Sequence, residues 1–300
     1  MILFHADDYG LSEHVSQEIH ALAAEGYLDG VSVIINMKHS VPALQSLLSI
    51  HSANSKLKIC LHLNFMEGHC CADASRIPLL VNSSGYFSLS WEKLFAVSFF
   101  PGLRKKYRQQ LQMEISAQIH HFLNAMPDSY ILRIDSHQHT HVIPVVWDAL
   151  MDVLSSESLA CEFIRLPTEP LMPFFKLPTL YSSYGLTSWI KNLILNICSL
   201  RASFQNPKSV PHFFALWGIM TGCHMDVERV SSLFPFFQKY GRGNRTLCLL
   251  FHPGQVLYSE ITPEYNNPAF LEVETSENRR MERDTLISLH DIILSSLQKT

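Results

Sequence analysis

The sequence predicts an α/β protein built on a distorted (β/α) barrel. Short apolar, β-rich runs alternate with helical patterns along the 300 residues, which is typical of a parallel sheet with crossover helices. Polar motifs follow several of the expected strands, as they do at the carboxyl-end opening of a barrel. No glycine-rich phosphate loop follows the first strand, so the alternative, an open doubly wound dinucleotide fold, has less support.

The elements of the N-terminal half follow from their apolar periodicity. The first strand, at 2–5, is short and stops at two acidic residues. Ser12 is a helix cap, and Gly26 ends that helix after about residue 25. The next expected elements are strands at 31–35, 57–63 and 130–134 and helices at 41–51 and 104–124.

The C-terminal half continues the alternation. Pro144 begins a helix to about residue 155, since proline is tolerated in a first helical turn. The later expected elements are strands at 162–166, 213–216 and 246–251 and helices at 186–202, 226–240 and 276–297. Residues 66–102 and 167–185 lack a clear pattern. We therefore expect one domain over 1–300 with lid-like insertions in these two segments.

The composition excludes several classes of protein. Hydrophobic residues make up 47% and charged residues 17% of the chain, which favours a filled core over disorder. The formal net charge of -4 provides no basic field for nucleic acid. The seven cysteines are odd in number and lack a Cys-x-x-Cys spacing, which argues against a disulfide framework or a cysteine zinc site.

The N-terminus and the apolar stretches bear on location. The chain reaches two acids by position 8, so its start does not fit a signal peptide. The apolar stretches near 94–101 and 193–200 are too short or interrupted for a transmembrane helix, which needs about 20 residues. We expect a cytoplasmic protein with reduced thiols.

Candidate functional residues stand where expected strands end. They are Asp7 and Asp8 after the first strand, His62 at the end of the third, the run from Asp135 to His141 after the fourth, and His252 after the seventh. In a (β/α) barrel these ends face one opening. The four motifs would therefore converge on one site.

The acids and histidines have functional and purely structural interpretations. One carboxylate of the Asp7-Asp8 pair could bind a metal while the other holds or deprotonates a water, or the pair could be a helix cap with a solvated neighbour. A lone histidine such as His62 in an apolar strand is more often a core residue. His252 could be a ligand, an acid or a supporting group.

The strongest pattern is the alternation of His137, His139 and His141. In an extended segment, alternate residues point to one side, and three imidazoles there favour a metal or a polar pocket over a loop of exposed histidines. Imidazole and carboxylate ligands suit Zn²⁺, Fe, Co or Ni more than Ca²⁺. Two histidines and one aspartate would leave positions open for water and substrate.

These motifs resemble the YdjC-like carbohydrate deacetylase family. The matching pieces, in the family's order, are ADDYGLS at 6–12, LHL at 61–63, DSHQHTH at 135–141 and HPG at 252–254. Tyr9 replaces the commoner phenylalanine. The resemblance implies a distorted barrel and a hydrolase that removes the N-acetyl group of an amino sugar with one divalent metal ion, Zn or Mg.

The resemblance also implies residue roles. Asp8, His62 and His137 look like metal ligands, Asp7 looks like the general base, and His252 looks like the acid or transition-state stabiliser. The remaining candidates would contact the substrate or support these groups: Asp135, His139, His141, Asn64 and Arg165.

Three further segments resemble the branch of the family that is associated with hopanoid biosynthesis. They are RIP at 76–78, FFPG at 99–102 and RLPTEP at 165–170. This implies a lipid-linked amino sugar as substrate, and it leaves open a peripheral membrane contact and a homodimer.

Two other functions remain as alternatives. A metal phosphoesterase would want more carboxylates or arginines than these motifs provide. A non-catalytic metal- or sugar-binding protein would not need the second acid of the Asp7-Asp8 pair.

Overall fold

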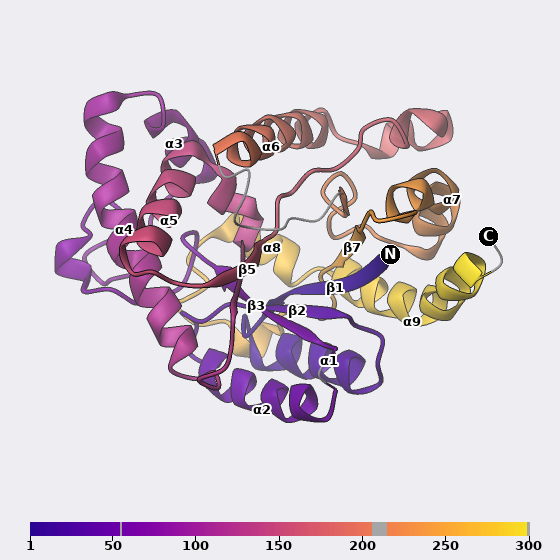
Figure 1. Cartoon of the computed structure of the whole chain (residues 1–300), viewed down its shortest axis with the longest axis horizontal. Helices are drawn as coiled ribbons and strands as arrows, with labels where there is room; N and C mark the ends of the chain where they lie inside the picture. The colour runs from indigo at the N-terminus through magenta and orange to yellow at the C-terminus, as the bar shows by residue number, and fades with distance from the viewer. Residues whose placement is uncertain (55, 206–214, 299–300) are drawn as a thin grey trace.

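The computed structural model describes residues 1–54, 56–205 and 215–298. In this part of the chain, parallel strands form one curled sheet that is flanked by helices (Figure 1). The strands are β1 (Ile2–Tyr9), β2 (Gly30–Val33), β3 (Lys58–Leu63), β4 (Leu132–Ser136), β5 (Cys161–Ile164), β6 (Ala215–Trp217) and β7 (Leu247–Phe251).

The strand order is β5-β4-β3-β2-β1-β7-β6, and every neighbouring pair is parallel. All carboxyl ends therefore lie along one edge of the sheet. Except for the edge strand β5, which is only partly buried, the strands are almost wholly buried, as expected for a parallel sheet that is covered on both sides. The fold class predicted from the sequence is confirmed as a barrel-like α/β sheet, in which β5 and β6 are the edge strands and, among the described residues, a gap separates them.

Chain segments that follow the two edge strands partly fill this gap. The backbone N–H of Leu216 in β6 donates to the carbonyl of Thr168 at 2.8 Å. Glu169, which is fully buried, accepts from the backbone N–H groups of Gly218, Ile219 and Met220 at 2.7 to 3.0 Å. One carboxylate thus joins the segment after β5 to the turn after β6.

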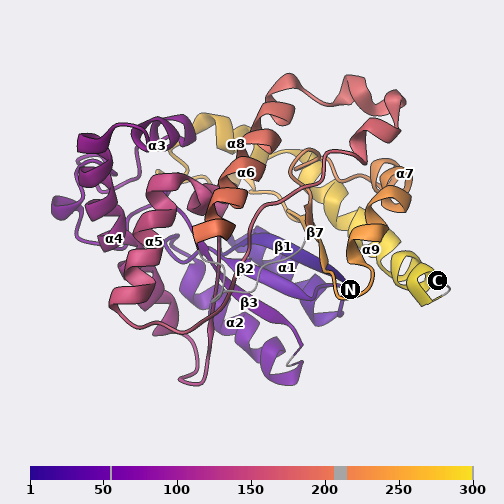
Figure 2. The same cartoon turned by 45° about the horizontal axis from the view of Figure 1, so that its top comes forward.

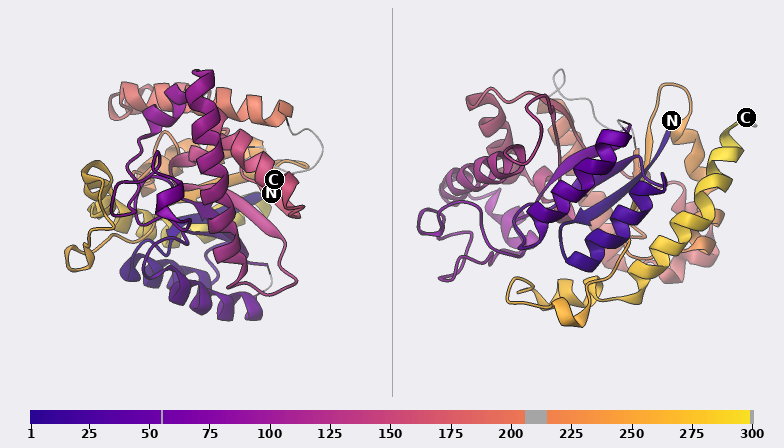
Figure 3. Two further views of the ribbon diagram at one scale, coloured as in Figure 1. Left: turned by 90° about the vertical axis from the view of Figure 1, so that its left-hand side faces the viewer. Right: turned by 90° about the horizontal axis from the view of Figure 1, so that it is seen from below.

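Helices surround the sheet on several sides. They are α1 (Glu13–Ala24), α2 (Ser40–Ala53), α3 (Trp91–Val97), α4 (Pro101–Leu123), α5 (Pro144–Ser156), α6 (Leu186–Gln205), α7 (Val227–Phe237), α8 (Pro268–Glu274) and α9 (Glu277–Gln298). Helices α1 and α2 lie on the opposite side of the molecule from α6 (Figures 1 and 3). No helix of the described ranges combines the length and apolarity required to cross a bilayer.

Several predicted boundaries need correction. The first strand does not stop at the acids but includes them and ends at Tyr9. The segment 66–102 is not wholly irregular, because it contains α3, the start of α4 and isolated β-bridges. The predicted strand at 213–216 is seen from Ala215, and its first two residues lie outside the described ranges.

Helix α8 was not predicted. A signal for it exists in the sequence, since Asn267 caps the helix through a bond from the N–H of Ala269 and Pro268 occupies its first turn.

Candidate active site

The end of β1 places two adjacent carboxylates in one cavity. The register of β1 against β2 shifts between Ala6 and Tyr9, and Asp8 has a φ of 69°. A non-glycine residue in this left-handed region breaks the usual alternation of a strand. Asp7 and Asp8 consequently both line the cavity, and both are buried.

Gly10 gives the chain its exit from this strand. Its φ is +92°, and a Cβ atom there would lie 2.6 Å from the carbonyl oxygen of Ile34. Only glycine fits this turn without displacing the neighbouring backbone.

The cavity has a volume of about 530 Å³ and lies at the carboxyl ends of the strands. Its walls come from segments far apart in the sequence, including residues 185–191 around the start of α6 and residues 269–274 in α8, which Figure 2 shows near one another. Residues 66–102 are not among the described residues that line it. The expectation that this segment is a lid therefore gains no support from the cavity.

Asp8, His62 and His137 form the centre of the site. The Oδ1 atom of Asp8 lies 2.9 Å from Nδ1 of His137 and 3.4 Å from Nε2 of His62. One ligand atom from each residue lies within 4.8 Å of the other two, and all three side chains are buried. The chain thus has a His/Asp cluster that could hold a metal ion.

Asp135 orients the imidazole of His62. Its Oδ1 atom lies 2.5 Å from Nδ1 of His62, so the opposite nitrogen, Nε2, faces the aspartates. Burial opposes protonation of His62, but the carboxylates of Asp7 and Asp135 outweigh it and raise its pKa to about 10. A carboxylate behind a histidine is a common support of a metal ligand.

Arg165 binds Asp7 through two hydrogen bonds. Its Nη1 and Nη2 atoms donate to Oδ1 and Oδ2 of Asp7 at 2.9 and 2.5 Å. The Nη2 atom also lies 3.2 Å from Asp135. Burial favours the protonated acid, but Arg165 and His62 prevail and hold the pKa of Asp7 below its usual range. Asp7 is therefore ionised and fixed in position.

The other predicted residues divide between the cavity wall and its support. His139 lines the cavity, and its Nδ1 atom has no hydrogen-bond partner among the described residues. His141 does not line it, because its ring contacts Ser136 at 2.6 Å and the carbonyl of Arg165 at 2.8 Å. Asn64 is buried in the turn after β3 and donates to Asn36 and to the carbonyl of Glu67.

The histidine run is not extended as the sequence suggested. It forms the 3-10 segment η2 (His137–Val142), in which Gln138 and His139 have φ values of 54° and 57°. This strained turn directs His137 and His139 toward the cavity and sends His141 beneath it.

His252 lies at the cavity mouth. Its side chain is 18% exposed, and its Nδ1 atom is 3.7 Å from Glu282, too far for a hydrogen bond. The backbone N–H of His252 donates to the same carboxylate at 2.6 Å. Glu282 therefore fixes the backbone after β7, while Nδ1 of His252 has no hydrogen-bond partner among the described residues.

Charged residues of the site that were missed in the sequence include Arg279, Glu67 and Glu274, and Lys191 also lines the cavity. Arg279 of α9 donates to Oδ2 of Asp8 at 2.7 Å. Glu67 lies with its Oε1 atom 3.6 Å from Nε2 of His137, and Glu274 of α8 is close to the same group. Arg279 and Glu274 belong to a charged stretch at 272–284 that is indistinguishable in sequence from a solvated helix face. Glu67 follows His62 closely and could have been found from that spacing.

The donor set fits a divalent cation. Arg279 occupies Oδ2 of Asp8, so one carboxylate oxygen and two imidazole nitrogens remain as ligand atoms. Burial opposes ionisation of Asp8, but His137 and Arg279 hold its pKa well below the usual range, so this carboxylate is ionised and ready to bind. Such a set leaves further coordination positions open, as catalytic sites do.

Several curated proteins are similar in sequence to part of this chain. A carbohydrate deacetylase of Vibrio parahaemolyticus is 30% identical over 48% of the chain and 51% of its own length. Carbohydrate deacetylases of Clostridium beijerinckii and Danio rerio are 22% and 28% identical over 65% and 56% of the chain, and over 74% and 50% of their own lengths. The chain thus spans about half the length of most curated relatives that it matches.

One solved structure is similar over nearly the whole fold. It is a putative cellobiose-phosphate cleavage protein from Enterococcus faecalis, with a TM-score of 0.57 and 15% identity, and the match covers 96% of this chain and 94% of that one. At this identity the likeness shows the fold alone. The family model of the YdjC-like proteins matches residues 1–290, a range that includes every residue that lines the cavity described above. The chain therefore belongs to the YdjC-like protein family.

Proposed function

We propose that this protein hydrolyses the N-acetyl group of an amino sugar, in an oligosaccharide or a lipid-linked glycan, with one divalent metal ion. The observation that carries the proposal is the division of labour between Asp7 and Asp8. Asp8 faces two imidazoles, whereas Asp7 is held by Arg165 and faces the same cavity. Adjacent carboxylates with separate partners suit a ligand and a base.

The relatives support the substrate class. Several curated proteins that match this chain are named carbohydrate deacetylases. The cavity volume of about 530 Å³ is in the range of small-molecule sites. Its wall combines polar groups such as His139 and Ser188 with apolar ones such as Phe270 and Met220, as a sugar with polar edges and apolar faces requires.

The chain's own groups would act as follows. Asp8, His62 and His137 hold the ion, Zn or Mg, and a bound divalent cation polarises a carbonyl and lowers the pKa of coordinated water. Asp7 accepts the proton of the attacking water, and Arg165 keeps it ionised and oriented. His252 donates a proton to the leaving amine from its imidazole at the cavity mouth. His139 and Arg279 contact the substrate or neighbouring carboxylates from the wall.

The phosphoesterase alternative has weaker support. A phosphoryl group requires cations that are free to bind it. The guanidinium groups closest to the ligand set, Arg165 and Arg279, are each bound to an aspartate of the site. The two guanidinium charges nearest the ligand set are thus already neutralised, and Lys191 is the other basic side chain that lines the cavity in the described part of the chain.

The direct test is acetate release. Purified protein is stripped with a chelator, reloaded with Zn²⁺ or Mg²⁺, and incubated with a panel of N-acetylated mono- and oligosaccharides and with a phosphomonoester as control. We expect acetate from at least one sugar, only in the reloaded samples, and no phosphate. A protein that binds metal but releases no acetate from any sugar would instead be a binding protein.

A further inference from the structure

Helix α6 has its apolar face outward. Six large apolar residues with helical spacing point away from the protein and are 51% to 75% exposed; they are Leu186, Ile190, Leu193, Ile197, Leu200 and Phe204. We call this set the α6 apolar face. The side that packs inward contains Leu195 and Cys198 together with small and polar residues, Asn192, Ser199 and Ala202. An ordinary surface helix has charged and polar residues on its outward face instead.

Hydrogen bonds fix this orientation of the helix. Asn192 donates to the carboxylate of Glu169, and Asn196 donates to its backbone carbonyl at 3.0 Å. Toward the other end, Arg201 donates to Asp148 of α5 at 2.8 Å. Rotating α6 to bury its leucines would break these bonds and leave Glu169 without one of its partners. The outward apolar face is therefore built into the fold.

The exposed apolar surface continues at the start of α4. Phe99, Phe100 and Leu103 are 63%, 58% and 47% exposed. Arg104 of α4 and Arg201 of α6 bind the same carboxylate, that of Asp148. The beginning of α4 and helix α6 accordingly lie on one side of the molecule, the upper side in Figure 1 and in the left panel of Figure 3.

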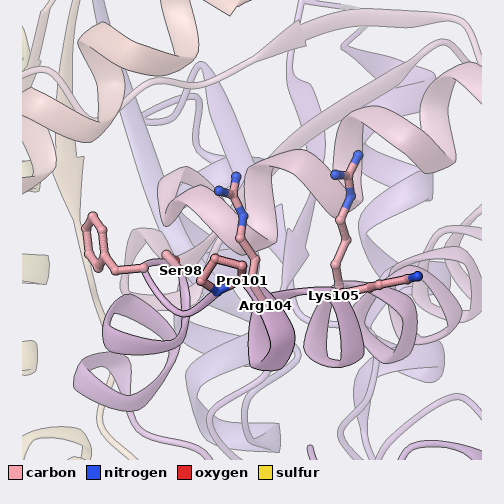
Figure 4. Close-up of a pocket in the computed structure, with 6 residues that line it drawn as sticks. Ser98, Pro101, Arg104 and Lys105 are labelled. Atoms are coloured by element: carbon pink, nitrogen blue, oxygen red, sulfur yellow. The ribbon is translucent and has the colours of Figure 1, made fainter.

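Positive charge accompanies this surface. The segments 93–113 and 170–205 contain eight lysines and arginines and no aspartate or glutamate. Arg104, Arg108 and Arg201 are paired with Asp148 and Asp152 of α5, so the positive charge of this side comes from the five lysines. Lys105 and Lys106 are exposed on the first turns of α4. Next to them is a surface hollow of about 550 Å³, lined by Phe99, Pro101 and basic side chains, part of which is shown in Figure 4.

We propose that the α6 apolar face and the adjoining start of α4 dock onto an anionic lipid surface. A helix with an apolar face of this size and flanking cations lies in the plane of a membrane interface, with its apolar side chains among the acyl chains and its cations near anionic headgroups. A second copy of the chain would fit less well, because a symmetric contact places the same basic segments opposite each other.

Docking would bring the cavity close to the lipid surface. Gly185, Ser188 and Lys191, at the start of α6, line the cavity that holds the candidate active site. The same helix thus separates the site from the surface that contacts lipid. A site this close to the lipid surface would suit an amphiphilic substrate. That consequence rests on the proposed function, whereas docking of the protein onto lipid does not.

The test is co-sedimentation of the full chain with vesicles. The vesicles contain phosphatidylcholine alone or mixed with phosphatidylglycerol. We expect wild-type protein to bind the mixed vesicles more tightly than the neutral ones, with binding that weakens as salt is added. The double variant Ile190→Ser/Ile197→Ser should lose at least about tenfold in affinity. Lys105→Glu/Lys106→Glu should lose about tenfold or more on anionic vesicles only.

Two controls make the outcome decisive. Ile292→Ser changes an apolar residue of α9 that is 62% exposed, and it should bind like wild type. Circular dichroism shows whether each variant is folded. Absence of wild-type binding to either vesicle overturns the proposal. Light scattering then identifies the alternative. If the wild-type protein does not bind vesicles but forms a dimer that Ile190→Ser/Ile197→Ser dissociates, the α6 apolar face joins two copies of the chain. Neither readout depends on deacetylation.

Discussion

Arg165 holds both carboxylate oxygens of Asp7 in a fully buried ion pair, so the position of the candidate base is set by a residue 158 places along the chain. Because the segment after β5 supplies Arg165 and β1 supplies Asp7, the pair also connects distant strands across the interior of the sheet. Both the geometry and the ionisation of Asp7 depend on this contact.

Arg165→Lys tests this dependence. Lysine cannot form the two parallel hydrogen bonds of a guanidinium group, so Asp7 becomes less well placed. We expect kcat to fall about 100-fold and the acid limb of the pH–rate profile to move upward, because the Asp7 pKa rises. A fall in kcat with an unchanged acid limb would show that Arg165 positions Asp7 but does not set its pKa.

Asp7→Asn separates the base from the ligands. Asparagine cannot accept the water proton, so we expect kcat to fall by about 10²–10⁴-fold while metal content is retained. The matched variant Asp8→Asn, one residue away, should lose metal together with activity. Metal content is measured by elemental analysis after dialysis. Near wild-type turnover of Asp7→Asn would show that another group is the base.

Glu67→Gln tests the support of His137. Burial and the neighbouring Glu274 raise the pKa of Glu67 well above its usual range, and its Oε1 atom lies 3.6 Å from the unpartnered Nε2 of His137. Loss of such a carboxylate behind a ligand costs about 10–100-fold in metal affinity. A competition titration with a chromogenic chelator measures this change. Glu274→Gln, which relieves the like-charge pair, should have a smaller effect, and equal effects would contradict this role of Glu67.

Glu169→Ala tests the closure between β5 and β6. The change leaves three buried backbone N–H groups without their acceptor, so the free energy of unfolding should fall by about 3 kcal/mol or more. Urea denaturation measures it. Glu162→Ala, which removes a half-buried carboxylate paired with Lys58 and Arg133, should cost under about 1 kcal/mol. Equal costs would show that Glu169 is not a special link.

The combined contribution of His5, His62 and His141 to the stability of the metal-free protein should be greatest near pH 6.5. Burial lowers the pKa of His5 and of His141 to about 4, so the unfolded chain, with a histidine pKa of about 6.5, takes up their protons first as pH falls, and stability decreases. Asp7 and Asp135 raise the pKa of His62 to about 10 against the effect of burial, so its contribution is lost as pH rises from about 6.5 to 10. Denaturation in chelator at several pH values checks this shape. A steady rise in stability up to pH 9 would contradict it.

Much of the site could be predicted because its residues stand next to apolar strands. The alternation of strands and helices placed Asp7, Asp8, His62 and His137 at one edge of a parallel sheet, and the structure brings these side chains into one cavity. Arg279 and Glu274 could not be found in this way, because α8 and α9 contribute them from charged sequence that carries no strand signal. The charge pattern of a helix does not predict which charged side chain points into the cavity.

The sequence by itself determined the fold class, the edge of the sheet at which the strands end, and the motif residues of the cavity. These could be predicted because apolar periodicity and short-range spacing are local properties of the sequence. Only the tertiary structure decided how those residues are used. The register shift in β1 at Asp8 directs the neighbouring carboxylates of Asp7 and Asp8 into the same cavity. The turn at Gln138 and His139 directs His141 away from that cavity. Long-range bonds from Glu169 likewise oriented α6 with its apolar face outward. The physical reason is a comparison of free energies. Leaving a buried polar or charged group unpaired costs more than a strained backbone or an exposed apolar side chain, so ion pairs and hydrogen bonds between distant segments determine the final arrangement.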